Sequence, residues 1–212
     1  RALLGKLARA RAEKGVKLVD EKPFLFPGPV GHVPDRRVVV VGAGCAGLFC
    51  ALSLARAGLR PLLVERGDDA TRRGEVVYAH NATGVLDPES NIQFGVGGAG
   101  TFSDGKLQTG TKSPAHRLIL QEFVDAGAQP QILWDAKPHV GSDVLPGVVT
   151  NILRQIEEAG GEVRTRCRMT DIEVEAGAVR ETVEIIEMED VPLAYYPGNT
   201  NRVKIKAAGD LS

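Results

Sequence analysis

The hydrophobic positions of residues 36–65 form two short apolar runs separated by a longer segment of small residues. Residues 38–41 are four consecutive valines, a run typical of a strand that is buried on both faces in a parallel sheet. Residues 48–57 are rich in Ala and Leu and end before Gly58, which indicates a helix. Residues 61–65 read as a second strand. This order predicts a βαβ unit, and therefore an α/β fold with a Rossmann-like parallel sheet.

The pattern beyond this unit is less regular. Residues 66–113 are rich in Gly with few periodic stretches, which predicts a loop-rich region. Residues 114–126 read as a helix, with Ser and Pro at its start and Gly after its end. Apolar residues recur at helical spacing over residues 147–159, which predicts a second helix. Strands are expected at residues 162–167 and 170–175.

These patterns divide the chain into three parts. Residues 1–35 combine a basic, weakly amphipathic helix with a linker rich in Pro and Gly. Residues 36–180 form the α/β domain, which is expected to be incomplete. Residues 181–212 are an unassigned tail that contains β-prone segments. The chain begins at Arg1 rather than Met, which predicts a processed product, an excised domain or a fragment.

Composition narrows the possible function classes. The net charge of −1 gives no electrostatic reason to expect a nucleic acid or an acidic membrane as partner. No apolar run is long enough to predict a membrane span. The three cysteines have no metal-ligand spacing, so no metal site is predicted. A cytoplasmic location is expected, with organellar import through the basic N-terminus as the alternative.

The glycine turn after the first strand carries the most specific signal. Gly42, Gly44 and Gly47 have the GxGxxG spacing, and Glu65 follows 23 positions after the first of them. The first glycine permits the tight turn, the second lets a diphosphate approach the backbone, and the third permits close packing of helix and strand. Glu65 is placed to accept hydrogen bonds from an adenosine ribose, which disfavours a 2′-phosphate and hence NADP. The alternative is a glycine turn in an α/β domain that binds no nucleotide.

A second glycine-rich segment occupies residues 95–106. Residues 100–106 nearly match a P-loop, but Leu107 stands where the magnesium-binding Ser or Thr belongs and no apolar strand precedes the segment. We therefore expect a second backbone-lined surface that closes over the same dinucleotide.

Three stretches resemble one family. Residues 90–107, with the sequence SNIQFGVGGAGTFSDGKL, are similar to the signature of a little-characterised group of FAD-dependent dehydrogenases within the glutathione-reductase-like, two-dinucleotide-binding flavoproteins. Residues 136–143 and 160–172 resemble the same group. The resemblance covers about residues 36–180 and so only the N-terminal part of such a protein. It implies FAD as the cofactor.

The resemblance also implies site residues. The cofactor-binding set comprises the diphosphate turn, the ribose site, the segment that runs toward the flavin, and a backbone contact to adenine: Gly42, Gly44, Cys45, Ala46 and Gly47; Glu65 and Arg66; Gly97, Gly98, Ala99, Gly100 and Thr101; and Met169. Cys45 stands where the family usually has Pro. A thiol beside a helix N-terminus is either reactive through a lowered pKa or, as we favour, a small buried filler.

Candidates for catalysis are fewer. Asp104, Lys106 and His139 are polar groups near the flavin-side glycines, where Lys106 would stabilise negative charge and His139 would transfer a proton. Exposed loop charge is the alternative for each. Asp210 loosely resembles the aspartate that binds ribityl hydroxyls, with a turn residue as the alternative.

The sequence thus predicts an FAD-dependent oxidoreductase that passes a hydride or electrons through the flavin. Its partner would be a small-molecule substrate or an electron carrier, with NAD(P) as a possible donor or acceptor in the full-length protein. A single-site NAD-dependent dehydrogenase and a truncated, non-catalytic nucleotide-binding module are the alternatives. The oligomeric state stays open.

Overall fold

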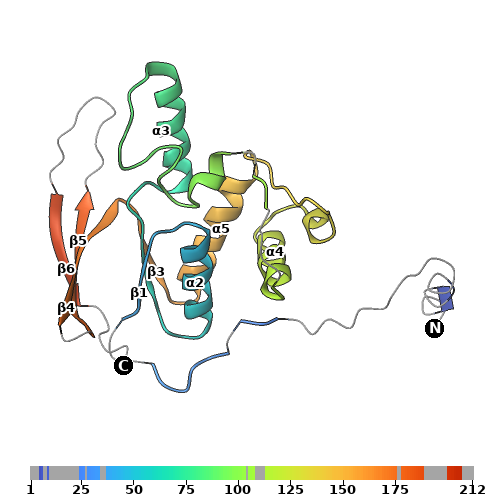
Figure 1. Ribbon diagram of the computed structural model, residues 1–212, viewed down its shortest axis with the longest axis horizontal. Coiled ribbons are helices and arrows are strands. Elements are labelled where there is room, and N and C mark those ends of the chain that lie inside the picture. The colour runs from blue at the N-terminus through green and yellow to red at the C-terminus, as the bar shows by residue number, and fades with distance from the viewer. Residues whose placement is uncertain are drawn as a thin grey trace.

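The computed structural model in Figure 1 describes residues 5, 6, 9, 24–26, 28–33, 37–103, 105–107, 113–175, 178–188 and 200–206. Parallel strands alternate with helices in its first part, and three antiparallel strands follow. The elements are β1 (Val39–Val41), α2 (Cys45–Arg56), β2 (Leu62–Val64), α3 (Ala70–Thr83), the 3-10 helix η1 (Ala99–Phe102), α4 (Ala115–Asp125), the 3-10 helix η2 (Pro130–Leu133), α5 (Leu145–Glu158), β3 (Glu162–Arg164), β4 (Cys167–Glu175), β5 (Ala178–Met188) and β6 (Thr200–Lys206). This arrangement confirms the predicted α/β class with a Rossmann-like parallel sheet.

The parallel sheet has the order β1-β2-β3, and its central strand β2 is fully buried. The valine run predicted burial of β1 on both faces, but β1 lies at the edge of the sheet, where Val40 is buried and Val41 is 50% exposed. Val40 and Leu63 belong to the main hydrophobic core, which α2 and α5 complete. Leu62 and Val64 point to the opposite face and pack with Cys167 of β4. Alternate residues of one strand therefore serve two different contacts, because successive side chains of a strand point to opposite faces.

The two helices predicted from apolar spacing are present. α4 lies within the predicted range 114–126, and α5 begins at Leu145, two residues before the predicted start. Five of the apolar positions that predicted α5 are buried: Val148, Val149, Ile152, Leu153 and Ile156. Within the described part of the chain, no helix has the length and apolar character needed to cross a membrane.

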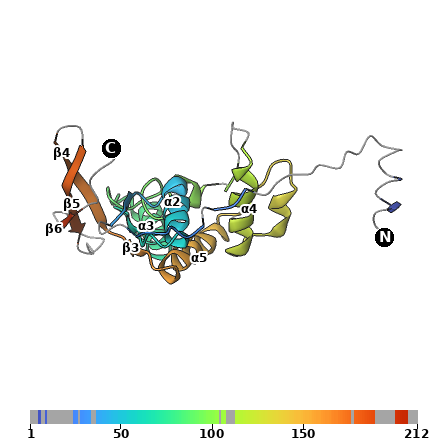
Figure 2. The ribbon, with the colours of Figure 1, turned by 90° about the horizontal axis from the view of Figure 1, so that it is seen from below.

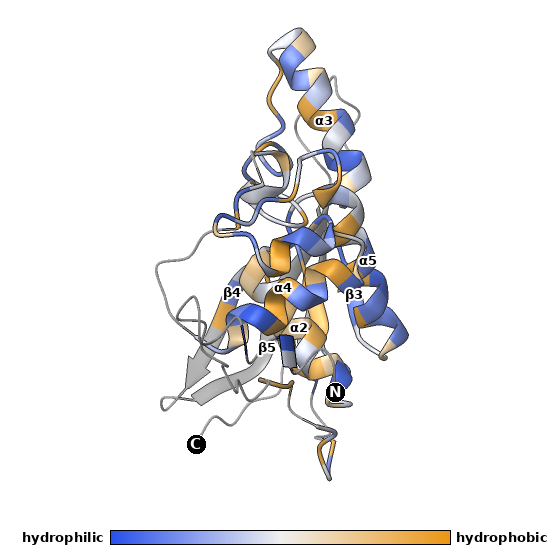
Figure 3. Cartoon of the chain, turned by 90° about the vertical axis from the view of Figure 1, so that its right-hand side faces the viewer, coloured by the Kyte–Doolittle hydropathy of each residue, from blue (hydrophilic) through white to orange (hydrophobic). Residues whose placement is uncertain are grey.

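Helix α3 corrects the prediction of a loop-rich region over residues 66–113. The Asp69 carboxylate accepts two backbone N–H bonds from the first turn, and Gly84 ends the helix in a left-handed conformation with φ +76°. Figure 3 shows α3 projecting from the sheet with polar and apolar residues mixed along it. Only three of its residues are buried, namely Ala70, Arg73 and Val76. The helix has no long apolar stripe, which is why hydrophobic spacing missed it.

The predicted strand over residues 162–167 is wrong at its end, because β3 stops at Arg164 and Cys167 starts β4. Between them Arg166 has φ +51°, a conformation that breaks a strand. β4, β5 and β6 form a separate antiparallel sheet in that order, which confirms the predicted β-containing tail. Figure 2 shows this second sheet beside the first.

Candidate dinucleotide-binding site

The glycine turn between β1 and α2 has a distinct geometry at each of its three glycines. The Gly42 N–H donates to the Val64 carbonyl oxygen at 2.7 Å, and Gly42 has φ +91°, which favours glycine. Gly44 is the N-cap of α2, and a Cβ added there would meet nothing within 4 Å. A Cβ on Gly47 would overlap the Gly42 carbonyl oxygen. The turn therefore combines a tight bend, open space at the helix N-terminus and close packing of the helix.

Glu65 lies directly after β2 and is buried, with 5% of its surface exposed. Its Oε2 accepts a hydrogen bond from the Ala43 N–H at 2.8 Å, and its Oε1 accepts one from the Gly67 N–H at 2.9 Å. An ionised carboxylate has about four lone-pair sites, so acceptor capacity remains for ligand hydroxyls. The side chain that was predicted to bind a ribose is thus also the group that holds the glycine turn in place.

The second glycine segment lies against the first. The Gly97 N–H donates to the Ala43 carbonyl oxygen at 2.7 Å, and a Cβ on Gly98 would lie 3.4 Å from the Gly44 Cα. Both Gly97 and Gly98 have positive φ, at +88° and +71°. The predicted proximity of the two glycine segments is therefore present, while the dinucleotide between them stays a prediction.

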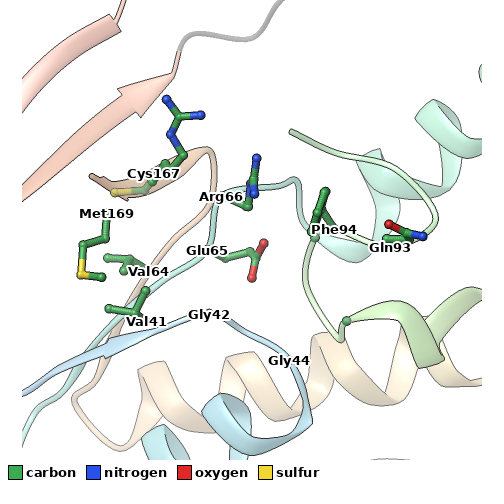
Figure 4. Close-up of a pocket in the computed structure, with 13 residues that line it drawn as sticks. Val41, Gly42, Gly44, Val64, Glu65, Arg66, Gln93, Phe94, Cys167 and Met169 are labelled. Carbon is green, nitrogen blue, oxygen red and sulfur yellow. The ribbon is translucent and has the colours of Figure 1, made fainter. Parts of the chain in front are cut away.

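A pocket of about 340 Å³ opens at the carboxyl ends of β1 and β2 (Figure 4). Ligands of open α/β sheets bind at this edge. The lining residues are Val41, Gly42, Gly44, Val64, Glu65, Arg66, Gln93, Phe94, Gly95, Gly98, Cys167, Arg168 and Met169. Figure 4 shows Val41, Val64 and Met169 gathered on one side, with Glu65 and Phe94 on the other. The pocket thus has an apolar end and a polar end.

Arg66 is held at the polar end by two neighbours. Its Nη2 lies 2.8 Å from a Glu89 oxygen, and its guanidinium lies 4.3 Å from the centre of the Phe94 ring. Arg168 pairs with the other oxygen of Glu89 at 2.6 Å. Two arginines therefore share one carboxylate beside the pocket.

The pocket brings together six of the predicted cofactor-binding residues: Gly42, Gly44, Glu65, Arg66, Gly98 and Met169. The other predicted cofactor-binding residues do not line it: Cys45, Ala46, Gly47, Gly97, Ala99, Gly100 and Thr101. Sequence reasoning missed Phe94 and Arg168 as lining residues. Phe94 lies inside the 90–107 signature, so that signature was the signal that could have found it.

Two of the three catalytic candidates, Lys106 and His139, are neighbours. Lys106 and His139 face each other in an isolated antiparallel bridge, and the Val140 N–H donates to the Gly105 carbonyl oxygen at 2.9 Å. Neither candidate lines the pocket. Asp104 and Asp210 lie outside the described residues.

Cys45 differs from the sequence expectation. It is exposed in the first turn of α2 rather than buried as a filler. Burial around its sulfur atom raises the pKa of the Cys45 thiol, which is the direction opposite to the lowered pKa expected of a reactive thiol. Among the described residues, no group of His, Cys, Asp or Glu is arranged to hold a metal ion.

An ion-pair network centred on Arg166 links segments that neighbour the pocket-lining residues in the chain. Arg166 donates to both oxygens of Asp68, at 2.7 and 2.8 Å, and to Asp87 at 2.7 Å. The backbone of Asp68 also accepts a hydrogen bond from the Val96 N–H at 3.0 Å. The network therefore connects the end of β2, the 87–96 segment and the turn before β4.

The pKa of Asp87 predicts that the stability of the fold depends on pH. Burial raises the pKa of Asp87, but hydrogen bonds from Arg166 and from the Glu89 and Ser90 N–H groups outweigh it and hold the pKa below its ordinary value. A carboxyl with a depressed pKa stabilises the fold above its unfolded pKa of about 3.9, and this contribution is lost as the pH falls through the folded pKa. The deficit in unfolding free energy of Asp87→Asn should therefore be largest at pH 7 and shrink below about pH 4.

Urea denaturation of both proteins between pH 7 and pH 3 measures this deficit. A deficit of constant size over that range would contradict the assignment.

Two features of the site fit an adenine dinucleotide. The space at Gly44 would admit a diphosphate to the N-terminus of α2. Glu65 has acceptor capacity for ribose hydroxyls. The predicted residue Thr101 is fully buried outside the pocket lining, and its hydroxyl has no hydrogen-bond partner within the part of the chain that the structure describes.

Comparisons with known proteins agree with this chemistry. Residues 37–90 match the family described as FAD dependent oxidoreductase. A protein of Clostridium beijerinckii described as uncharacterized is 46% identical over 147 residues, which are 69% of this chain and 28% of that protein. Protein FixC of Salmonella typhi is 28% identical over 171 residues, which cover 74% of this chain and 35% of FixC.

Two further proteins share smaller or weaker similarity. The probable electron transfer flavoprotein-quinone oxidoreductase YdiS of Escherichia coli is 47% identical over 51 residues, which are 23% of this chain and 12% of YdiS. The crystal structure of Thermovibrio ammonificans THI4 has a TM-score of 0.44 at 18% identity, covering 81% of this chain and 54% of THI4. This chain spans 12% to 35% of the length of the three sequence relatives. The matched residues 37–90 contain β1, α2, β2 and α3, so this part of the site has the pattern of FAD dependent oxidoreductases.

Proposed function

We propose that this chain holds the ADP part of FAD in an FAD-dependent oxidoreductase of the glutathione-reductase-like type. The contact between the two glycine segments carries the proposal, with the Gly97 N–H bonded to the Ala43 carbonyl oxygen beside Glu65. A single glycine turn is common to many dinucleotide sites. A second glycine segment packed on the first supports a ligand that is enclosed from two sides.

Different residues of the pocket would bind different parts of the dinucleotide. Gly42, Gly44 and the N-terminus of α2 would bind the diphosphate, since free N–H groups and the positive end of the helix dipole favour an anion. Glu65 would accept hydrogen bonds from the ribose. The adenine would lie at the apolar end of the pocket, against Val64 and the backbone of Met169.

Bound FAD would supply hydride or electron transfer to the whole protein. Its substrate would be a small molecule or an electron carrier, with NAD(P) as a candidate partner. In this proposal Lys106 and His139, which are adjacent in the fold, stabilise charge and move a proton near the flavin.

The test compares the wild-type chain with Gly44→Ala. A Cβ at Gly44 meets no protein atom within 4 Å but occupies the space where the diphosphate would lie. Because Ala is a poorer N-cap residue than Gly, we expect the variant to lose about 1 kcal/mol of unfolding free energy and to remain folded. It should bind FAD at least about tenfold more weakly, which corresponds to about 1.4 kcal/mol. Titration calorimetry and the flavin absorbance that survives desalting measure binding.

The matched control is Gly147→Ala in α5, where an added Cβ also meets nothing within 4 Å. This control should bind FAD as the wild type does. A folded wild-type chain that retains no flavin and shows no FAD binding would overturn the proposal. Tighter binding of NAD than of FAD would favour a single-site NAD-dependent dehydrogenase instead.

A further inference from the structure

Arg73 of α3 is fully buried, and among the described residues its guanidinium donates to main-chain carbonyl oxygens of residues 91–98 and to no side chain. The acceptors and their distances are Asn91 at 2.8 Å, Ile92 at 2.9 Å, Val96 at 2.9 Å and Gly98 at 2.8 Å, with Gly95 farther away at 3.4 Å. One side chain therefore fixes the path of the segment that forms one wall of the pocket.

No carboxylate among the described residues forms an ion pair with Arg73. Arg166, the other arginine that is buried in the described part of the chain, forms ion pairs with Asp68 and Asp87. Burial lowers the pKa of Arg73 to about 10, with Glu65 acting in the opposite direction, so the guanidinium stays charged near neutral pH. The Phe102 ring lies 4.9 Å from this charge. The charge of Arg73 is thus stabilised by carbonyl dipoles, a ring face and the more distant carboxylate of Glu65, without a direct ion pair to any carboxylate of the described residues.

The direction of the carbonyl groups has a consequence for the pocket. Gly95 and Gly98 both line it, and Arg73 binds the carbonyl oxygens of both. Because the Gly95 and Gly98 carbonyl oxygens point toward the guanidinium, they do not repel an anionic group of a ligand that enters the pocket. The same restraint leaves the N–H of Gly97 free to bond the Ala43 carbonyl oxygen in the glycine turn.

Gly95 explains why the fit is specific. Gly95 has φ +122°, and a Cβ there would lie 2.5 Å from the Arg73 Cδ. The segment therefore needs a glycine at this point so that its backbone can approach the arginine. The long side chain of Arg73 therefore packs against the backbone at Gly95, where any other residue would leave no room for it.

We propose that Arg73 is a positioning residue for the diphosphate of the dinucleotide: it holds the 95–98 segment against the glycine turn and places an unpaired positive charge behind the diphosphate subsite. This inference rests on the proposed function, because it presumes that a dinucleotide binds in this pocket. It assigns the residue to the diphosphate and not to the nucleoside.

The experiment compares the affinities of ADP and adenosine for the full chain. Calorimetry measures ADP binding, and ligand-observed NMR measures the weaker adenosine binding. The variants are Arg73→Lys, which keeps the charge with fewer donors, and Arg73→Met, which removes both. Arg154→Met is the control, because Arg154 is exposed on α5 and pairs only with Glu158.

We expect Arg73→Met to weaken ADP binding at least about tenfold and to change adenosine binding less than about twofold. Arg73→Lys should fall between Arg73→Met and the wild type, and the control should match the wild type. The preference of the wild type for ADP should decrease with salt more steeply than that of Arg73→Met, because salt screens charge interactions.

Two results would overturn the inference. Equal losses of ADP and adenosine affinity would assign Arg73 a purely structural role, and unchanged ADP affinity would assign it none. If Arg73→Met does not fold, the ADP-to-adenosine ratio of Arg73→Lys decides between these outcomes. A wild-type chain that binds neither ligand would instead refute the proposed function, and this inference with it.

Discussion

Gly47→Ala is expected to lower the free energy of unfolding by about 3 kcal/mol, at the upper end of the usual cost of overpacking. An added Cβ would overlap the Gly42 carbonyl oxygen and lie 3.6 Å from a Val40 methyl carbon. The overlapped atom belongs to the backbone and cannot rotate away. Helix α2 would have to move from β1, and the open space at Gly44 would move with it. Urea denaturation with parallel FAD titration checks both effects.

The controls separate packing from helix propensity. Alanine is a better helix former than glycine by about 1 kcal/mol, so Gly147→Ala should leave the unfolding free energy unchanged or raise it. Gly44→Ala lies in the same turn as Gly47 but has no atom to overlap. It should weaken FAD binding while losing only about 1 kcal/mol of stability, because Ala is a poorer N-cap residue than Gly. An unfolding midpoint for Gly47→Ala equal to that of Gly147→Ala would refute the close packing.

The βαβ unit was predictable because its constraints are local. The valine run indicates a strand with a strong β preference, and its Val40 packs in the main core while Val39 packs against the cluster that includes Cys167 of β4. The positive φ of Gly42 and the close packing at Gly47 require glycine whatever the rest of the fold does. The position of Glu65 directly after β2 followed from the same spacing, while its binding of a ribose stays a prediction. These features depend on the chain within about thirty residues.

Helix α3 and its buried arginine were not predictable in this way. The capping residues Asp69 and Gly84 were visible in the sequence, but a short polar helix gives no periodic apolar signal. Arg73 reads as surface charge until the 91–98 carbonyl groups fold around it. Such a partner set consists of backbone atoms, which carry no side-chain identity for a sequence pattern to reveal.

The break between β3 and β4 has a similar cause. Arg166 adopts φ +51°, a conformation that a non-glycine residue rarely adopts. Its ion pairs with Asp68 and Asp87, which are 98 and 79 positions away in the chain, accompany this conformation. A local reading of residues 162–167 finds no Gly, Pro, Asn or Asp that would mark a turn, and so it extends the strand. Local sequence patterns therefore could not predict this break in the strand, because the break accompanies ion pairs between residues far apart in the chain.

Arg166→Met is expected to lower the free energy of unfolding at pH 7 by about 3–5 kcal/mol, the usual cost of removing one partner from a buried ion pair. The side chains of Arg166, Asp68 and Asp87 are 9%, 4% and 11% exposed, so water cannot replace the lost cation easily. Two carboxylates would be left close together with no balancing charge. Because this network connects β2 to the 87–96 segment, FAD binding should weaken as well. Chemical denaturation and FAD titration of the same samples measure the two effects.

Charge compensation distinguishes this explanation from a simple loss of packing. Adding Asp68→Asn and Asp87→Asn to Arg166→Met removes both uncompensated carboxylates and should restore part of the lost stability. Arg154→Met, which removes an exposed pair with Glu158, should cost no more than about 0.5 kcal/mol. The deficit of Arg166→Met should also shrink as the pH falls, because protonation neutralises the two carboxylates. A triple variant no more stable than Arg166→Met at pH 7 would show that the arginine acts through its shape alone, and the pocket wall would then depend on packing rather than on charge.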